Sequence, residues 1–401
     1  MTEAPRIRWV LCWLMFGCSA LSFLDRQILS VLAPSLMSEL SMSSAAYSHV
    51  VFAFVLSYTV MFSVGGRVTD LLGTRLGLTL SVGLWSVASA GHALVAGAFG
   101  LGTARFFLGL GEGGCFPAVT KGATEWFPLE KRVLAIGIAN GGSAFGAVLA
   151  PPLAAGIAGR FGWRSAFLAT GLTGCIWVAT WLAATRHGVA PVQSLKEQPP
   201  AAPLRRMLAD RLVWRVMVSR FLFDPVFYFY MFWIPQYLAR ERKLSLDQIG
   251  SHFWIPFLVL GISNIVSGRI SDTLVRRGWS PRKTRATLLI AAALVTPVSW
   301  LAAAAPTVGW AIALMSGLML AHGFWISNFL GFLSDNFPSR AIATITGLSG
   351  TAGGIGGMLS SLAVGAIVER YSFAPVFAVS GVLYPVAAAI LLSRRRKPAA
   401  I

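Results

Sequence analysis

Long apolar runs separated by short polar stretches recur along nearly the whole chain. Runs of about 20 apolar residues match the length that an α-helix needs to cross roughly 30 Å of hydrocarbon. The pattern predicts an all-α membrane protein with about twelve transmembrane helices. Their expected starts lie near Ile7, Tyr47, Leu76, Gly97, Val133, Trp163, Val213, Gly250, Thr287, Gly309, Ala341 and Ala374. The first run is long and continues into further spans, so it is not expected to be a cleaved signal peptide.

Composition and charge agree with this interpretation. Of the 401 residues, 56% are hydrophobic and only 12% are charged. The net charge of +18 would suit a nucleic-acid partner, but most Lys and Arg fall in alternate loops. Basic residues stay on the cytoplasmic side of membrane proteins. We therefore expect no nucleic acid, a bacterial-type inner membrane location and two cytoplasmic termini. The four cysteines lie in apolar runs without metal-ligand spacing, so no metal is expected.

The most polar stretch lies near the midpoint of the chain and predicts a linker between two halves. We expect an N-terminal six-helix bundle over residues 1–185, a cytoplasmic linker over 186–212, and a C-terminal six-helix bundle over 213–401.

The two halves also resemble each other in sequence. The segments "GRVTDLLGTR" and "GRISDTLVRR" share the spacing of their glycine and aspartate, and "EWFP" matches "DNFP" at a shift of 210 residues. Such a duplication predicts two pseudo-symmetric bundles. Bundles of this kind rock about a central site in alternating-access transporters.

Four ionisable residues lie inside predicted spans: Asp25, Arg26, Arg105 and Glu112. A charge inside the bilayer is costly, so such residues usually face a watery cavity, pair together and mark an ion or proton path. Arg105 and Glu112 are seven residues apart, or roughly 10.5 Å along a helix, so they share a face but cannot bridge directly. Two acids and two fixed cations are the composition of a site that moves an anion with protons. A purely structural ion pair between helices remains the alternative.

The chain resembles the major facilitator superfamily in the loops that follow its second and eighth predicted helices. The motif positions are Gly66, Asp70, Gly73, Arg75, Gly268 and Asp272. An acid at the cytoplasmic end of a helix can pair with a basic residue or a helix N-terminus, and this gate contact breaks when the bundles part. The family usually has a basic residue after the aspartate, where this chain has Leu71 and Thr273. A loop that only sets topology is the other interpretation.

A closer resemblance covers almost the full length. "FLDRQILSVLAP", "RFFLGLGEGGCFPAVTKGATEWFP", "GIANGGSAFGAVLAPP" and "RFLFDPVFYFYMFWIPQYL" are similar to segments of the anion:cation symporter family, and most similar to its bacterial hexuronate and sugar-acid transporters. The resemblance implies that Asp25 and Glu112 carry the coupled protons. It also implies that Arg26 and Arg105 bind the substrate carboxylate or hold those acids ionised, and that Tyr58 faces the substrate.

Further polar residues lie in mid-span positions. Asn140, Ser143 and Asn328 are candidates for binding substrate hydroxyls, or for hydrogen bonds between helices. His322 lies opposite Glu112 under the 210-residue shift and is either a substrate contact or an ordinary buried histidine. Asp224 precedes Pro225, which predicts a hinge or a local cap.

These observations together predict a proton symporter that imports a small organic anion, with a hexuronate or another sugar acid as the leading candidate, and that works as a monomer without a cofactor. A sugar-phosphate exchanger is disfavoured because Arg105 aligns with Met315 rather than with a second arginine. A drug antiporter, a non-transporting sensor and an enzyme have less support, because their motifs are missing from the sequence. Phe23, where the family usually has an aromatic hydroxyl, leaves open a less polar carboxylate.

Overall fold

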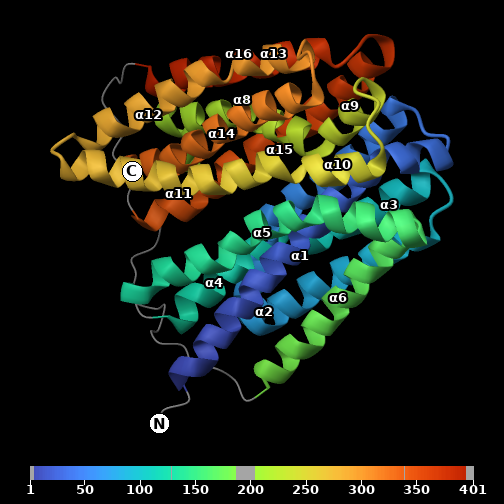
Figure 1. Cartoon of the computed structure of the whole chain (residues 1–401). Coiled ribbons are helices and arrows are strands. Elements are labelled where there is room, and N and C mark those ends of the chain that lie inside the picture. Colours follow the sequence, from blue (N-terminus) through green and yellow to red (C-terminus); the bar gives the residue numbers. More distant parts are fainter. Residues whose placement is uncertain (1–3, 128, 187–203, 338, 394–401) are drawn as a thin grey trace. The chain divides into compact units, whose positions relative to one another are not determined.

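The computed structural model describes residues 4–127, 129–186, 204–337 and 339–393. This part of the chain is α-helical, apart from its loops and one 3-10 turn over His92–Leu94. The first eight helices are α1 (Ala4–Glu39), α2 (Ser44–Gly91), α3 (Ala98–Gly113), α4 (Cys115–Trp126), α5 (Leu129–Phe161), α6 (Trp163–Ala184), α7 (Leu204–Leu208) and α8 (Arg211–Phe232). The others are α9 (Ile234–Arg240), α10 (Leu246–His252), α11 (Trp254–Arg276), α12 (Pro281–Val295), α13 (Val298–Ala303), α14 (Val308–Asn336), α15 (Ser339–Arg370) and α16 (Ala374–Leu392) (Figure 1).

Within the described residues, ten stretches are long and apolar enough to cross a membrane. Two of the predicted spans are not among them, for physical reasons. The run that starts near Gly97 is divided at Gly114 into α3 and α4, and each piece is short. The run that starts near Val213 forms α8, but it carries several charged side chains, which lower its hydropathy. The predicted all-α membrane fold is confirmed.

The first copy of the predicted loop motif lies within α2, which continues through two predicted spans. Gly73 interrupts it with φ 80° and ψ 160°. Residues with a side chain rarely adopt a positive φ of this size, which explains the glycine at this position. Arg75, just beyond, is exposed, and its carbonyl accepts a hydrogen bond from Trp181 Nε1 at 3.1 Å. In the second copy, Gly268 lies on α11, as does Asp272.

The contacts expected of the motif acids remain predictions. Gly66 and Asp70 lie on α2, but their side-chain surroundings and those of Asp272 are outside what the structure describes. Close to each copy of the motif, an acidic side chain accepts a hydrogen bond from another helix. Thr74 Oγ1 donates to Glu125 Oε2 at 2.8 Å, and Arg285 Nε donates to Asp335 Oδ2 at 3.1 Å.

The chain forms two compact units. Unit 1 comprises Met1–Glu197 and Phe232–Trp254, and unit 2 comprises Gln198–Met231 and Ile255–Ile401. In unit 1, α1 packs on α5, and α2 packs on α3 and α6. In unit 2, α14 packs on α12 and α13, and α16 packs on α13. The predicted linker is mostly outside the described residues, which leave out 187–203.

The segment that contains α9 and α10 belongs to unit 1, although it follows α8 in the sequence. Tyr47 on α2 donates its hydroxyl hydrogen to the carbonyl of Phe232 at 2.9 Å, and Arg240 Nη1 donates to Ser44 Oγ at 2.7 Å. Gly250 of α10 lies against α5, where an added Cβ would be 3.2 Å from the Pro151 carbonyl oxygen. These contacts attach α9 and α10 to the N-terminal helices.

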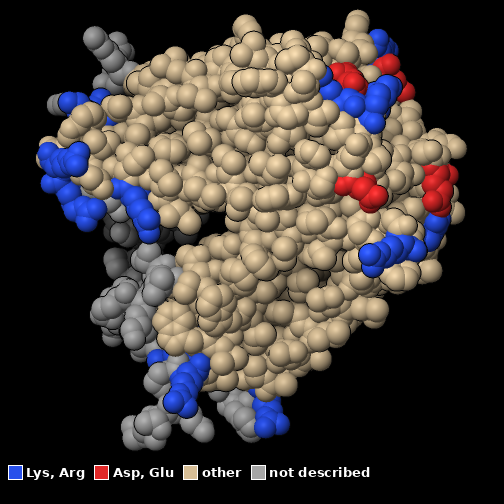
Figure 2. Space-filling model, viewed as in Figure 1, with Lys and Arg blue, Asp and Glu red and all other residues tan. Residues whose placement is uncertain are grey.

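Charged side chains on the visible face lie near the ends of the helices of each unit, and the surface between those ends is uncharged (Figure 2). This distribution suits helices that cross hydrocarbon, where an unpaired surface charge would be costly.

Close packing of α1 on α5 depends on glycine. A Cβ at Gly142 would overlap the carbonyl of Phe16, and a Cβ at Gly146 would overlap that of Ala20. Small residues let helix backbones approach each other closely in membranes. At Gly137 of the same helix, by contrast, an added Cβ meets nothing within 4 Å.

We therefore expect Gly142→Ala to destabilise the protein by about 1–3 kcal/mol, the usual cost of overpacking. Gly137→Ala should be neutral or slightly stabilising, because alanine favours the helix by about 0.5–1 kcal/mol over glycine. Thermal unfolding of the purified variants in detergent measures both effects. Equal midpoints for the two variants would contradict the packing argument.

Candidate functional site

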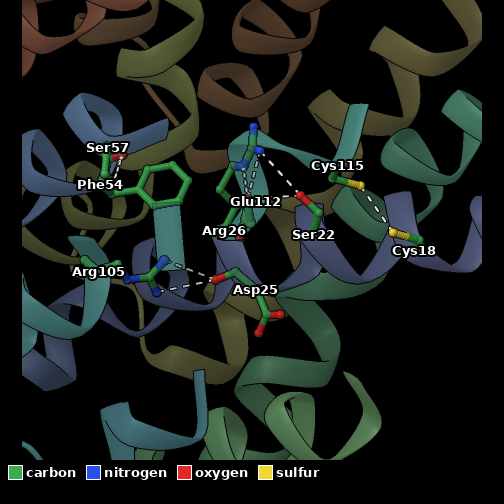
Figure 3. Close-up of polar contacts among 9 residues, drawn as sticks. All are labelled: Cys18, Ser22, Asp25, Arg26, Phe54, Ser57, Arg105, Glu112 and Cys115. Carbon is green, nitrogen blue, oxygen red and sulfur yellow. Dashed lines mark hydrogen bonds and ion pairs between the residues drawn. The ribbon is translucent and has the colours of Figure 1, made fainter. Parts of the chain in front are cut away.

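A buried ion pair joins α1 to the last turn of α3 in unit 1 (Figure 3). The Nε and Nη2 atoms of Arg26 each lie 2.8 Å from Glu112 Oε2. Ser22, one helical turn before Arg26, donates its hydroxyl to the same oxygen at 3.0 Å. Arg26 is only 5% exposed and Glu112 is fully buried. The two charges predicted from sequence are therefore brought together.

The second carboxylate oxygen of Glu112 is available for further chemistry. Within the described part of the chain, Oε1 is buried and has no hydrogen-bond partner. A buried polar atom without a partner is costly, and such exceptions often occur at functional sites. Oε1 is thus an oxygen of the ion-paired carboxylate on which a proton can bind, while Arg26 and Ser22 contact Oε2.

Glycines on both sides of Glu112 allow α3 to approach α2 closely at this point. An added Cβ at Gly111 would lie 2.6 Å from the backbone nitrogen of Trp85, and one at Gly113 would lie 2.7 Å from the Tyr58 carbonyl oxygen. The helix then ends at Gly114 and restarts at Cys115. The glycine-rich sequence around Glu112 therefore sets both the close helix contact and the break beside the acid.

Aromatic rings surround the Arg26 guanidinium. Its central carbon lies 4.3 Å from the ring centre of Tyr58, 4.7 Å from that of Phe23 and 5.4 Å from that of Phe54. A cation over an aromatic face is stabilised by the negative π surface, by about 2 kcal/mol when desolvated. Tyr58, predicted from the resemblance to face the substrate, thus lies directly beside a predicted anion-binding cation.

Asp25 and Arg105 form a separate arrangement. Arg105 Nη1 and Nη2 donate to the backbone carbonyl of Asp25 at 3.3 Å and 3.4 Å, while the Asp25 side chain points away from the guanidinium (Figure 3). The carboxylate instead accepts a hydrogen bond from Ser89 Oγ at 2.7 Å, and Ser89 in turn contacts Thr170 Oγ1 at 2.9 Å.

Neither member of this second arrangement is fully satisfied by the described residues. Asp25 Oδ2 and Arg105 Nε are buried and have no hydrogen-bond partner there. Phe167 covers the guanidinium, with its ring centre 5.6 Å from the central carbon. The site therefore holds one paired acid and one acid that is held only by hydroxyl groups.

Asn140 and Ser143, the candidates on α5, make no hydrogen bond to the four charged residues within the described part of the chain. Ser143 Oγ donates to the carbonyl of Asn140 at 2.7 Å, within the same helix. The side-chain oxygen of Asn140 is buried and has no partner among the described residues. Asn140 thus keeps an acceptor for another group.

The candidates of the C-terminal half lie in unit 2. His322 Nδ1 is 2.5 Å from the Tyr384 hydroxyl, and its ring stacks on Phe227 with centres 4.8 Å apart. Asn328 Nδ2 donates to Ser267 Oγ at 2.9 Å. Its side-chain oxygen is buried without a partner in the described part of the protein.

Sequence reasoning missed the hydroxyl groups that hold the acids, namely Ser22, Ser89 and Thr170. Ser22 was detectable, because it lies four residues before Arg26 and so shares its helix face. The other two come from α2 and α6, and only the tertiary structure brings them to Asp25.

Two cysteines also lie beside the ion pair (Figure 3). Cys18 is one helical turn before Ser22 and Cys115 is three residues after Glu112; their sulfur atoms are 3.2 Å apart and both residues are fully buried. A disulfide requires the two sulfur atoms to close to about 2.05 Å, so these facing thiols are candidates for a disulfide.

We expect copper(II) phenanthroline to oxidise Cys18 and Cys115 to a disulfide, with two electrons passing to two copper(II) ions and two protons released to the buffer. The bond should reduce transport strongly and reversibly, because it ties α1 to α4 next to the acid. Peptide mass spectrometry measures the bond, and uptake is measured before and after reduction. Cys18→Ser should be insensitive to the oxidant. A disulfide without loss of uptake would contradict the expected effect.

The fold and this buried set of acids and guanidinium groups define a class of protein. Residues 15–361 match the family model of the Major Facilitator Superfamily, and the chain belongs to that superfamily. It is a multi-pass membrane transporter and not an enzyme.

Named relatives narrow the comparison. The chain is 30% identical to the hexuronate transporter of Escherichia coli K12, over 95% of this chain and 92% of that protein. It is 32% identical to the galacturonate transporter of Dickeya chrysanthemi, over 67% of this chain and 82% of that protein. The predicted resemblance to the bacterial sugar-acid transporters is confirmed, and the protein is related to transporters of sugar acids and other organic anions.

A solved structure has the same fold. A bacterial homologue of the human lysosomal transporter Spinster, in an inward-facing and occupied conformation, superposes with a TM-score of 0.76 at 18% identity. The match covers 96% of this chain and 94% of that one. It supports the fold alone.

Proposed function

We propose that this protein imports a small organic anion, a hexuronate or another sugar acid, together with protons and by alternating access. The observation that carries the proposal is the buried Arg26–Glu112 pair, in which Ser22 completes the contacts of one carboxylate oxygen. The relatives named above transport hexuronate and galacturonate, which is consistent with a carboxylate ligand.

The pair supplies a simple coupling mechanism. A proton on Glu112 removes the negative charge that holds Arg26, so the guanidinium becomes available for the substrate carboxylate. A planar fork of N–H donors suits a carboxylate well. When the proton leaves, Glu112 competes for Arg26 again and favours release of the substrate. In this proposal proton and anion occupy the site together.

Asp25 is proposed as a second proton-binding group. Its carboxylate is held by Ser89 rather than by a cation. Arg105 lies close by, and its hydrogen bonds to described residues go to the uncharged Asp25 carbonyl, so its positive charge is available to favour a carboxylate in the cavity. Arg105 is accordingly proposed as the second anion-binding arginine of the N-terminal half.

Polar groups are proposed to select the rest of the substrate. The candidates for its hydroxyl groups are Tyr58, Asn140, Ser143, His322 and Asn328. The unpartnered oxygens of Asn140 and Asn328 support this role, because each accepts one more hydrogen bond.

A specific observation also favours a second candidate, a less polar carboxylate. Phe23 and Phe54 present ring faces to Arg26, and neither ring carries a hydroxyl group to bind a sugar. Exchange of one organic anion for another is the remaining alternative mechanism.

The proposal includes the arrangement of the whole chain. Residues 1–185 and 213–401 are proposed as the two moving bundles, joined by a cytoplasmic linker over 186–212. The proposed cytoplasmic gate is the loop motif with its copy: Gly66, Asp70, Gly73, Arg75, Gly268 and Asp272. We place the protein, as a monomer with both termini in the cytoplasm, in a bacterial inner membrane.

Uptake into proteoliposomes under an inward proton gradient tests the function. The panel is glucuronate, galacturonate, galactonate, lactate and an aromatic acid. Uptake of one acid that follows the imposed gradient would support proton symport. Uptake that ignores the gradient but requires an internal anion would support exchange instead.

A further inference from the structure

Unit 2 contains an ion pair that the mechanism above does not use. Arg220 Nε donates to Asp224 Oδ2 at 3.0 Å, within α8. The side chains are 19% and 13% exposed, respectively, near the middle of a helix that is long enough to cross the membrane. Charges at that depth face a water-filled cavity or the bundle interior rather than lipid. The exposed part of this pair is therefore expected to meet water.

Arg220 has a second set of contacts on α15. Its Nη1 donates to Ser349 Oγ at 3.2 Å and to the Thr346 carbonyl at 3.4 Å. The Arg220 hydrogen bonds to described residues come from Nε and Nη1, and none comes from Nη2. The guanidinium is thus held on one side and presents donor capacity on the other.

The glycine-rich sequence of α15 makes room for the acid. A Cβ at Gly353 would overlap the Asp224 carboxylate, and a Cβ at Gly356 would overlap the Phe221 carbonyl oxygen. Pro225 also lacks the N–H that would bond that carbonyl in a regular helix. The helices therefore meet closely around the pair, which fixes the position of Asp224 against α15.

A purely structural pair would be expected to use its donors fully and to exclude water. The Arg220 guanidinium instead keeps a partly exposed face, while its counter-ion on the same helix prevents an uncompensated charge. Fixed orientation, an available donor and a nearby serine hydroxyl are the elements of a carboxylate-binding group.

We propose that Arg220, oriented by Asp224 and Ser349, binds a carboxylate in the C-terminal half of the protein. This inference rests on the proposed function, because the carboxylate belongs either to the far end of the transported acid or to an exchanged counter-anion. Asp224 competes with that ligand for Arg220. Arg220 lies on α8, whereas the position that aligns with Arg105 is Met315 on α14.

Matched acids test the proposal by equilibrium binding to the purified protein in detergent. Galactonate carries one carboxylate and galactarate carries two on the same carbon skeleton. The double variant Arg220→Gln/Asp224→Asn removes both charges together and leaves neither unpaired. We expect it to weaken galactarate binding at least about tenfold and galactonate binding less than about twofold.

Asp224→Asn alone gives the opposite expectation. Without its competing charge, Arg220 should bind galactarate several-fold more tightly, which a merely structural pair would not produce. Arg215→Gln, on the same helix, is the control; its Nη1 donates to the Ser393 carbonyl at 2.9 Å, and its binding constants should equal those of the wild type. If the double variant does not fold, Arg220→Lys tests the same loss, because lysine lacks the planar fork.

The outcomes separate the two sources of the carboxylate and the two proposals. Selective loss of galactarate binding supports a two-carboxylate substrate. In the wild type, galactarate inside the vesicles should accelerate galactonate uptake if it serves as a counter-anion. Loss of this acceleration in the double variant supports that source of the carboxylate. Unchanged constants in the double variant overturn this inference but leave proton symport intact. If binding depends on Arg220 but uptake does not follow the proton gradient, this inference stands and proton symport is contradicted. A wild-type protein that binds neither acid overturns the inference.

Discussion

Replacing Glu112 by Gln is expected to reduce proton-driven uptake to the background of protein-free liposomes. The amide keeps the size of the side chain and can still accept from Ser22, but it cannot exchange a proton. It also cannot hold Arg26 by charge, so the anion site should remain occupied by substrate. We therefore expect exchange of labelled for unlabelled substrate to persist in this variant while net uptake is lost.

The comparison of net uptake and exchange contains its own control. A variant that had merely unfolded would lose both activities, whereas loss of coupling alone spares exchange. Ser22→Ala is a matched second variant, because it removes one hydrogen bond from Glu112 Oε2 and leaves the acid in place. It should retain gradient-driven uptake. Full net uptake by Glu112→Gln would show that the proton travels elsewhere.

Arg26→Met should destabilise the protein by about 3–5 kcal/mol, because it leaves the fully buried Glu112 carboxylate without its cation. The double variant Arg26→Met/Glu112→Gln should recover part of this loss, with a coupling free energy of about 0.5–3 kcal/mol. Thermal unfolding in detergent at neutral pH measures all three variants.

This cycle separates an ion pair from two independent residues. Strictly additive effects of the two single changes would contradict the pairing. The stabler double variant should still bind substrate much more weakly than the wild type, because only Arg105 of the two proposed anion-binding arginines remains. Substrate affinity equal to that of the wild type would remove Arg26 from the proposed site.

The sequence was informative about helices and about charges inside them. Hydropathy predicts the spans, and a mid-span charge is conspicuous, so Asp25, Arg26, Arg105 and Glu112 were all found. Which of them pair was not predictable from sequence. The Arg26–Glu112 contact joins α1 to α3, and helix packing decides it.

The hydrogen bonds that serine and threonine side chains make to Asp25 were also not predictable from sequence. Ser89 and Thr170 are common residues in apolar helices, and nothing in their sequence context points to Asp25. The Arg220–Asp224 pair had a signal, the four-residue spacing that places both on one helix face. The adjacent Pro225 favours a hinge or a cap at Asp224 instead, and neither interpretation involves Arg220.

The placement of α9 and α10 has a consequence for how the protein is made. Because residues 232–254 belong to unit 1, the first half of the translated chain lacks part of its own packing surface. The hydrogen bond from Tyr47 to the Phe232 carbonyl forms only after Phe232 has been synthesised. The contact of α5 near Pro151 with Gly250 likewise forms only after Gly250 has been synthesised. The N-terminal helices can insert as they leave the ribosome, but unit 1 is complete only after α8 has been synthesised. If the two halves were expressed separately, residues 232–254 of the second half would therefore have to pack on the helices of the first half to restore the native packing.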